Sequence, residues 1–341
     1  MKVLIIGGTG LISTGITRFL VERGDDVTIY NRGKQDVDIP ESVKKIIGDR
    51  KDYAGFEAQM KEAGSFDCVI EMIGFVPDEV ESDVRAFCGR IRQFIFCSTI
   101  DVYTKPAKNY PITEDAECQP SPTFHYAYNK AKCERVLEKA QEHGDFKLTV
   151  IRPAHTYGEG RGLVHPFAGG NHFFDRIRKG KPIIIHGDGS SLWGASHRDD
   201  VARAFGKAVG NEKAFGKAYH ATGEEWMTWD QYHQRIAEAM GAPIPKIVHI
   251  PTDLLYKVFP RTAEWTAENF QFSNIFDNTA ARNDLDFRYT IKWVDGVRRV
   301  VAWLDEHNQI ENSDHHPFYD RVISAWERLG EDMGKELSDL K

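Results

Sequence analysis

A tyrosine and a lysine, Tyr126 and Lys130, lie four residues apart in a segment patterned as a helix. Residues at this spacing share one helix face. A phenol alone is a poor base at neutral pH, because its unperturbed pKa is about 10. A neighbouring ammonium stabilises the phenolate and lowers that pKa, so the pair can exchange a proton with a substrate hydroxyl. Two more hydroxyls, Ser98 and Thr99, end the preceding apolar segment, and parallel sheets bind ligands at such strand ends.

A glycine-rich turn at residues 7–10 predicts a phosphate site. It follows the apolar residues 3–6 and precedes a helical pattern over residues 11–23, and a second apolar run covers residues 27–30. Strand, glycine turn, helix and strand form a βαβ unit. Glycine lets the backbone approach a pyrophosphate, and the helix N-terminus offers free N–H donors and a positive dipole. Ser13 stands where a third glycine is usual, which is a mild departure.

The residues after the second strand bear on the choice of dinucleotide. An acidic residue there binds the ribose 2′-hydroxyl of NAD, whereas an arginine accommodates the 2′-phosphate of NADP. This sequence has Asn31 and Arg32 at the end of that strand. The absence of a carboxylate at these two positions favours NADP. Asparagine can still hydrogen-bond a ribose hydroxyl, however, so the sequence is compatible with either cofactor.

The elements that must position these residues alternate along the first half of the chain. Further apolar strands are expected at residues 45–48, 68–70, 94–97 and 148–151, with helices at residues 79–87 and 126–143 between them. This alternation predicts an α/β fold with a Rossmann-type, doubly wound parallel sheet. A helix at residues 197–209 and a strand at residues 218–221 are expected to return to that sheet.

The predicted domain division follows from where the alternation loosens. Residues 1–160 and about 197–222 form the expected NAD(P)-binding Rossmann domain. About 161–196 and 223–310 form a smaller, discontinuous C-terminal substrate-binding domain. Residues 311–341 form a tail with one amphipathic helix, in which Trp326 lies on the apolar face.

Composition excludes several classes of protein. The chain has 341 residues, 41% of them apolar, which is typical of a globular protein. A net charge of −7 makes nucleic-acid binding unlikely. Five dispersed cysteines without a C-x-x-C pair indicate reduced thiols. Because the sequence has no long apolar run and no signal peptide, we expect no membrane contact and a cytoplasmic location.

Seven motifs resemble the extended short-chain dehydrogenases/reductases of the NAD-dependent epimerase/dehydratase family, over residues 1 to about 305. The motifs are GGTGLIS (7–13), GDR (48–50), FIFCSTIDVY (94–103), YAYNKAKCE (126–134), IRPAHTYG (151–158), HRDDVARAF (197–205) and FDNTAARNDL (276–285). The resemblance implies that Tyr126 is the general base and acid. It implies that Lys130 tunes Tyr126 and holds the nicotinamide ribose, and that Thr99 hydrogen-bonds the substrate oxygen.

The remaining site assignments are also expectations. Asp49 would contact adenine and Pro153 the carboxamide; His155 is as well suited to a structural hydrogen bond as to substrate contact. The cofactor contacts are expected at Gly7, Gly10, Leu11, Ile12, Asn31, Arg32, Asp49, Gly74, Lys130 and Pro153. The substrate contacts are expected at Ser98, Asp101, His155 and Trp193, where the tryptophan ring would stack on a sugar face.

Departures from the family's motifs bear on which reaction and substrate to expect. The acid pair that follows the threonine in sugar-nucleotide dehydratases is reduced to Asp101, because Ile100 takes the first position. Trp193 stands where a diphosphate-binding arginine is usual, and a second such arginine is missing near residues 267–269. Because Thr99, Tyr126 and Lys130 are all present on an architecture that resembles the family's, we expect an epimerase that acts on a sugar or sugar derivative through a keto intermediate. The alternative, which the missing arginines and the Asn31–Arg32 pair favour, is an NAD(P)-dependent dehydrogenase or reductase of a polyol or sugar-like substrate.

A narrower resemblance links the chain to plastid stem-loop RNA-binding members of the superfamily. It rests on PDEVESDV, FIFCSTIDVYTK, NHFFDRI and NRGK, but the Tyr/Lys pair that those relatives have lost is intact here. An RNA-binding non-enzyme is therefore the third hypothesis. Asp314, His315 and His316 could ligate a metal, but adjacent residues in a polar tail are more typical of a linker, so we predict no metal site. The resemblance also allows for a homodimer.

Overall fold

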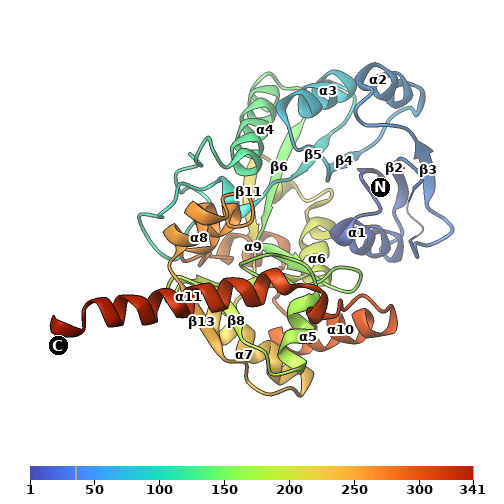
Figure 1. Ribbon diagram of the computed structural model, residues 1–341. Helices are drawn as coiled ribbons and strands as arrows, with labels where there is room; N and C mark the ends of the chain where they lie inside the picture. The colour runs from blue at the N-terminus through green and yellow to red at the C-terminus, as the bar shows by residue number, and fades with distance from the viewer. Residues whose placement is uncertain (35–36, 341) are drawn as a thin grey trace. The chain divides into compact units, whose positions relative to one another are not determined.

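The computed structural model describes residues 1–34 and 37–340, which form two compact units (Figure 1). Unit 1 comprises Met1–Gly158, Gly194–Glu225 and Ile275–Lys292. Unit 2 comprises Glu159–Trp193, Trp226–Asn274 and Trp293–Lys341. Residues 275–292, which the sequence analysis placed in the substrate-binding domain, thus lie in unit 1, because helix α9 (Thr279–Leu285) buries apolar side chains in the same core as the sheet.

Unit 1 is built on a seven-stranded parallel sheet in the order β11-β6-β5-β4-β1-β2-β3. The strands are β1 (Lys2–Ile6), β2 (Asp26–Asn31), β3 (Lys44–Ile47), β4 (Cys68–Glu71), β5 (Gln93–Cys97), β6 (Lys147–Pro153) and β11 (Lys217–Ala221). The chain passes from β3 at the edge back to β4, which pairs with the other side of β1. This switch point beside β1 is where open parallel sheets bind ligands. The predicted Rossmann fold is confirmed.

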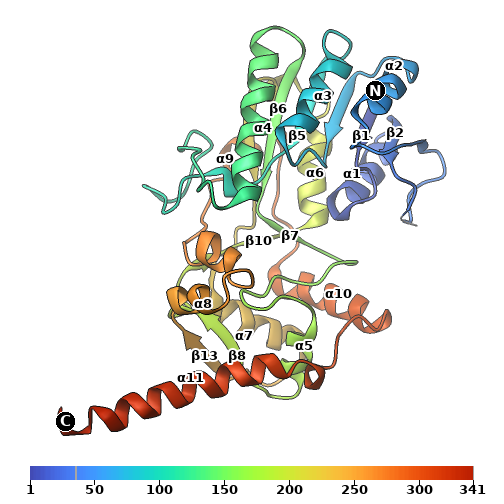
Figure 2. The ribbon, with the colours of Figure 1, turned by 45° about the horizontal axis from the view of Figure 1, so that its top comes forward.

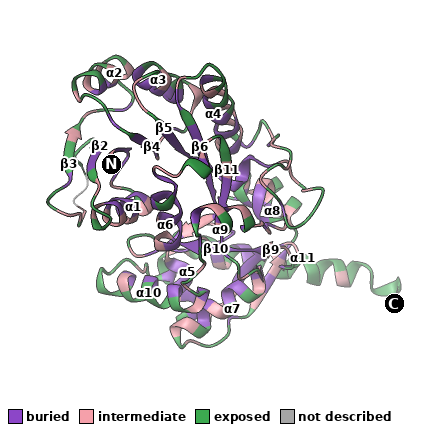
Figure 3. Ribbon diagram, turned by 180° about the vertical axis from the view of Figure 1, so that it is seen from behind, coloured by how far each residue is buried: buried purple, intermediate pink, exposed green. Residues whose placement is uncertain are grey.

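Helices cover both faces of this sheet (Figure 2). The helices α1 (Leu11–Glu22), α6 (Arg198–Ala208) and α9 share one core, and α2 (Tyr53–Glu62), α3 (Pro77–Phe87) and α4 (His125–Glu142) share the other. In β1, Val3 and Ile5 lie in the first core while Leu4 and Ile6 lie in the second. Such a strand is apolar throughout because alternate side chains enter opposite cores, and the central strands are buried accordingly (Figure 3).

Shorter elements of unit 1 follow the strands. The 3-10 turn η1 (Ile100–Val102) follows β5, and a second turn, η2 (Glu212–Ala214), precedes β11. A parallel pair, β7 (His155–Tyr157) and β10 (Ala195–His197), lies after β6 and before α6.

Unit 2 is a smaller α/β body. It contains the parallel pair β8 (Ile183–His186) and β13 (Ile247–Ile250) and the antiparallel pair β9 (Leu192–Trp193) and β12 (Met227–Thr228). Its helices are α5 (His172–Arg178), α7 (Trp229–Met240), α8 (Thr252–Val258), α10 (Trp293–Glu306) and α11 (Pro317–Glu336), with short turns η3 (Thr266–Phe270), η4 (Ser313–His315) and η5 (Ser338–Leu340).

The long helix α11 contains the apolar segment that the sequence predicted in the tail. Its buried residues Tyr319, Val322 and Ile323 share a core with Ile184 and Val248 of the β8–β13 pair. Its C-terminal half is mostly exposed (Figure 3). Among the described residues, no helix has the length and apolar character needed to cross a membrane.

Candidate active site

The glycine turn after β1 is shaped by the side chain of Ser13. Its hydroxyl accepts a hydrogen bond from Gly10 N at 2.7 Å and donates one to Gly7 O at 2.7 Å. Gly7 has a φ of +84°, and a Cβ there would lie 2.5 Å from a methyl group of Ile73, so only glycine fits. The Ser13 side chain therefore holds the two ends of the turn together. The sequence analysis noted Ser13 only as a mild departure from the usual glycine and did not predict this role.

A cavity of about 550 Å³ opens beside this turn, within unit 1. Five of the predicted cofactor residues line it: Gly7, Gly10, Asn31, Arg32 and Asp49. The other lining residues are Thr9, Tyr30, Gly33, Lys34, Gly48, Arg50, Lys51, Ile73, Phe75 and Glu79. This lining fits the phosphate and adenosine parts of a dinucleotide. It combines a glycine backbone where a Cβ would not fit, a helix N-terminus and a rim of polar groups.

Three exposed cations stand on the rim of this cavity: Arg32, Lys34 and Lys51. Asn31 bends the chain that carries the first two, because its Oδ1 accepts a hydrogen bond from Gly33 N at 2.7 Å. The carboxylate of Asp49 caps the next turn by accepting from Lys51 N at 3.0 Å. The rim thus presents cations where an NAD-specific site presents a carboxylate.

Lys130 is almost wholly buried, at 1% exposure, and links the C-terminal ends of two neighbouring strands, β4 and β5. Its Nζ donates to Cys97 O, at the end of β5, at 2.6 Å and to Gly74 O, after β4, at 2.9 Å. The same ammonium lies 4.5 Å from the ring centroid of Phe96. Gly74, a predicted cofactor residue, therefore holds the lysine through its carbonyl.

Tyr126 lies one helical turn before Lys130, in the first turn of α4, and is half-buried. A half-buried phenol can be reached by a substrate, while the buried ammonium one turn along is shielded from water. The roles of Tyr126 as proton carrier and of Lys130 as the group that tunes it stay predictions. Leu11 and Ile12 are half-buried at the start of α1, and Pro153 ends β6.

The hydroxyl residues predicted at the end of β5 are buried. Thr99 Oγ1 donates to Asp101 Oδ2 at 2.9 Å and accepts from Asp101 N at 3.2 Å. The carboxylate of Asp101 also lies 3.9 Å from the Nζ of Lys105. Burial lowers the pKa of Lys105 to about 8. Asp101 thus orients Thr99, and its predicted contact with substrate stays a prediction. The Oγ of Ser98 is buried and has no hydrogen-bond partner among the described residues.

A buried polar cluster behind these hydroxyls escaped the sequence analysis. Arg152 of β6 pairs with Glu134 of α4 at 2.6 Å and donates to the hydroxyl of Tyr103 at 2.7 Å. The same hydroxyl contacts His220 Nε2 of β11 at 2.6 Å. The cluster ties η1, α4, β6 and β11 together. Its members lie far apart in the chain, so no local signal could have joined them.

Two predicted substrate residues lie in different units. His155 belongs to β7 in unit 1 and is half-buried, so its contact with substrate stays a prediction. Trp193 belongs to unit 2 and is 2% exposed. Its ring stacks on Trp229 at 5.1 Å and meets Phe270 edge-on at 5.1 Å. Trp193 is therefore a core residue, and this packing offers no exposed ring face for the sugar stacking that the sequence predicted.

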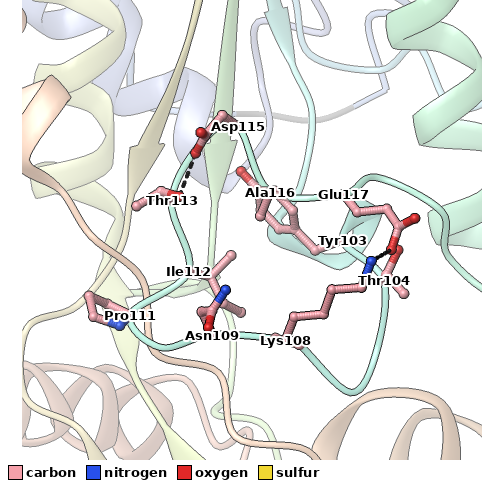
Figure 4. A pocket seen from close by; sticks show the side chains of 11 residues that line it. Tyr103, Thr104, Lys108, Asn109, Pro111, Ile112, Thr113, Asp115, Ala116 and Glu117 are labelled. Atoms are coloured by element: carbon pink, nitrogen blue, oxygen red, sulfur yellow. Dashed lines mark hydrogen bonds and ion pairs between the residues drawn. The ribbon is translucent and has the colours of Figure 1, made fainter.

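A second cavity, of about 250 Å³, lies in the loop between η1 and α4 (Figure 4). Its wall includes the ion pair of Lys108 and Glu117 at 3.0 Å and the hydrogen bond between Thr113 and Asp115 at 2.5 Å. None of the predicted catalytic or cofactor residues lines it. The glycine-turn cavity is therefore the one that matches the predicted chemistry.

Comparison with known proteins decides the family. The model of the NAD-dependent epimerase/dehydratase family matches residues 3–221, which include the glycine turn, Thr99, Tyr126 and Lys130. The chain belongs to this family. The predicted family, enzyme class and nicotinamide dinucleotide cofactor are thereby confirmed; the individual roles of the site residues stay predictions.

Three family relatives illustrate the range of functions. A chloroplast stem-loop binding protein of 41 kDa from Arabidopsis thaliana is 33% identical over 73% of this chain, which spans 65% of that relative's length. The 2'-dehydrokanamycin reductase of Streptomyces kanamyceticus is 24% identical over 81% of this chain and 77% of its own. The UDP-glucuronic acid 4-epimerase of Bacillus cereus, solved with NAD, is 16% identical, with a TM-score of 0.67 over 90% of this chain and 99% of its own. The predicted resemblance to stem-loop binding members is thus confirmed, while the epimerase shows the shared fold.

Proposed function

We propose that this protein is an NADP(H)-dependent oxidoreductase that interconverts a carbonyl and a carbinol on a sugar-like polyol. The cationic rim formed by Arg32, Lys34 and Lys51 carries the proposal. A 2′-phosphate is dianionic or nearly so, and guanidinium and ammonium groups bind it with charge-assisted hydrogen bonds. The residue at the ribose position, Asn31, brings no negative charge that would repel it.

An exchangeable cofactor that is phosphorylated at the 2′ position supports net redox chemistry rather than epimerisation, because an epimerase regenerates its cofactor within each cycle. When bound, the dinucleotide supplies or accepts the hydride. Gly7 and Gly10 would hold its pyrophosphate, Asp49 its adenine, and Lys130 its nicotinamide ribose.

The protein's own groups handle the proton. In the reducing direction, Tyr126 gives its hydroxyl proton to the carbonyl oxygen, and the ammonium of Lys130 stabilises the phenolate that remains. Thr99 switches its hydroxyl from Asp101 to the same oxygen and so orients it. In the oxidising direction the same groups act in reverse, with the phenolate of Tyr126 taking the carbinol proton.

The lack of diphosphate-binding arginines supports a smaller substrate than a nucleotide sugar. Trp193 occupies the position of one such arginine and is buried among aromatic rings. A dianionic diphosphate without bidentate arginine partners binds weakly. An uncharged or weakly charged polyol needs no such partner.

Epimerisation through a keto intermediate is the second candidate function. It uses the same three residues, Thr99, Tyr126 and Lys130, and needs a cofactor that stays bound through the cycle. Identification of the nucleotide released when freshly purified protein is denatured separates the two. Stoichiometric NAD would support the epimerase and overturn the oxidoreductase. A protein that releases none, binds NADPH reversibly and oxidises it with a keto sugar supports the proposal.

A substitution of Tyr126 tests the proton transfer. Tyr126→Phe should lower the rate of carbonyl reduction by about 10²–10⁴-fold and leave NADPH affinity unchanged, because only the proton donor is lost. The matched control is Tyr128→Phe, which changes a half-buried tyrosine of the same helix whose ring lies 4.4 Å from the ammonium of Lys132. Equal rates in the two variants would show that Tyr126 does not move the proton.

A further inference from the structure

Three metal-ligating side chains of unit 2 come together outside the candidate active site: His172, Glu311 and His316. His172 begins α5, Glu311 precedes η4, and His316 precedes the first residue of α11. One ligand atom from each lies within 4.8 Å of the others. The start of α11 lies beside α5 in both ribbon views (Figures 1 and 2).

The distances suit a small transition-metal ion. His316 Nε2 lies 3.4 Å and His172 Nδ1 lies 3.8 Å from Glu311 Oε2. Tetrahedral bonds of about 2.0–2.1 Å place neighbouring ligand atoms about 3.4 Å apart. The two imidazole rings are nearly parallel, at 14°, with centroids 4.3 Å apart. Because nitrogen lone pairs lie in the ring planes, at least one of these stacked rings must turn before both nitrogens can bind the same ion.

His172 supplies the second, independent sign of a ligand. Its side chain is 4% exposed, and neither ring nitrogen has a hydrogen-bond partner among the described residues. Buried polar atoms are almost always hydrogen-bonded, so two orphaned nitrogens on one buried ring need an explanation.

A glycine, Gly170, lies against two of the three side chains. Gly170 has a φ of +78°, and a Cβ there would lie 3.1 Å from His172 Nδ1 and 3.3 Å from Glu311 Oε2. Any larger residue would crowd the two ligand atoms. The nearby Arg176 is neutralised by Asp320 at 2.6 Å, so it does not oppose a bound cation.

We propose that His172, Glu311 and His316 bind one divalent transition-metal ion, zinc by preference, and that the ion ties the start of α11 to α5. Two imidazoles and one carboxylate favour zinc over magnesium or calcium, which prefer oxygen ligands throughout. A water molecule completes the coordination. Of the group that the sequence singled out, only His316 takes part, because Asp314 pairs with Lys179 and Lys181. This inference does not depend on the proposed function, since the ligands all lie in unit 2.

Zinc titration of the untagged, full-length chain after chelation tests the proposal. The expected result is one zinc ion per chain and a rise in melting temperature, since an ion that binds the folded state stabilises it. Cobalt(II) at the same site should give the visible absorption of a four-coordinate ion. No saturable binding would overturn the proposal.

Conservative variants separate this site from adventitious binding. Glu311→Gln and His316→Ala change exposed or half-exposed residues and should fold, yet should weaken zinc binding by about tenfold or more. His315→Ala removes the neighbouring exposed histidine and should bind zinc as the unaltered chain does. Zinc affinity and thermal shift that stay unchanged in Glu311→Gln and His316→Ala would assign the ion to another place and overturn the proposal.

Discussion

The two units differ in the titratable groups that they bury. Unit 1 buries charges and pairs them: Arg152 with Glu134 at 2.6 Å, and Arg50 with Asp83 at 2.9 Å and Glu71 at 3.5 Å. Burial raises the pKa of Asp83, and the neighbouring Glu71 raises it further. Charges taken out of water are tolerated only when such partners compensate them.

Unit 2 also pairs a buried charge, Arg176, with Asp320 at 2.6 Å, but it contains in addition a chain of buried, neutral, hydrogen-bonded histidines. His165 Nδ1 lies 2.9 Å from His233 Nε2, and His165 Nε2 lies 2.9 Å from the hydroxyl of Tyr319. That hydroxyl accepts from Ile184 N at 2.6 Å, and His233 Nδ1 bonds Trp229 O at 2.8 Å. One assignment of protons satisfies every group in this chain without a charge.

The contrast shows why His172 stands out. Of the other buried histidines of unit 2, His165 and His233 have partners at both ring nitrogens, and His186 has one at Nε2 but none at Nδ1. His172 has none at either nitrogen among the described residues. A metal ion bound at Nδ1 would give one of these two nitrogens a partner.

Acidic pH should destabilise unit 2 more than unit 1, and this is the largest effect that we expect. Burial lowers the pKa of His186 and His233 from 6.5 to about 4, and it lowers that of His165 well below 6.5. The folded state binds fewer protons than the unfolded one below pH 6.5, so this stability is present above pH 6.5 and is lost as the pH falls towards 4. Each of the first two should cost about 2 kcal/mol between pH 6.5 and 5.

Tryptophan fluorescence reports this loss in unit 2, because all seven tryptophans lie there. Urea unfolding followed by fluorescence should show a falling midpoint below pH 6.5. Hydrogen exchange in the sheet of unit 1 should change less, although burial also lowers the pKa of His220 there to about 4. A fluorescence midpoint independent of pH between 7 and about 5 would contradict neutral burial of these histidines.

Breaking an ion pair tests the other half of the contrast. Glu134→Gln leaves the guanidinium of Arg152 buried without its countercharge and should lower the free energy of unfolding by about 3 kcal/mol. Hydrogen exchange across β6 and α4 should rise most. The control is Glu212→Gln, which removes the exposed partner of Arg92 and should change stability little. If both variants lost a similarly small amount of unfolding free energy, the claim that the buried Arg152–Glu134 pair stabilises unit 1 would be refuted.

Removing one link of the histidine chain should have a smaller effect. Tyr319→Phe deletes the hydroxyl that joins His165 to Ile184 N, leaving both unpaired, at a cost of about 1–3 kcal/mol. Urea unfolding followed by fluorescence measures it. Phe318→Tyr, on the exposed neighbouring ring, serves as control. If Tyr319→Phe unfolds at the same urea concentration as the unaltered chain, the chain of hydrogen bonds does not stabilise unit 2.

The smallest expected effect concerns Ser13. Ser13→Ala removes the hydroxyl that spans the glycine turn and should lower stability by about 1 kcal/mol. Dinucleotide affinity should fall as well, because the turn loses its fixed shape. Thermal unfolding and ligand titration measure the two effects, with the exposed Ser42→Ala as control. Unchanged affinity would mean that the turn keeps its shape without Ser13.

Local patterns in the sequence predicted unit 1 well, for a physical reason. The strands of a buried parallel sheet are apolar throughout, so residues 3–6, 27–30 and 94–97 are recognisable without any partner. The glycine turn and the Tyr126–Lys130 pair are likewise short-range features.

What sequence reasoning missed depends on distant partners. Arg152 and Glu134, or His172 and Glu311, meet only after folding, and neither member signals the other. Trp193 was expected to stack on a sugar from its position alone, yet Trp229 and Phe270 enclose it. The bond between Asp101 and Thr99 was also missed, although a carboxylate two residues along can reach that hydroxyl.

The most direct test of the account compares the affinities of the purified protein for NADPH and NADH. The cations on the cavity rim predict that NADPH binds about tenfold or more tightly than NADH. Arg32→Ala should remove most of that preference, whereas Lys45→Ala, an exposed lysine outside the cavity, should keep it. Equal or tighter binding of NADH, or a preference that Arg32→Ala leaves unchanged, would contradict the account.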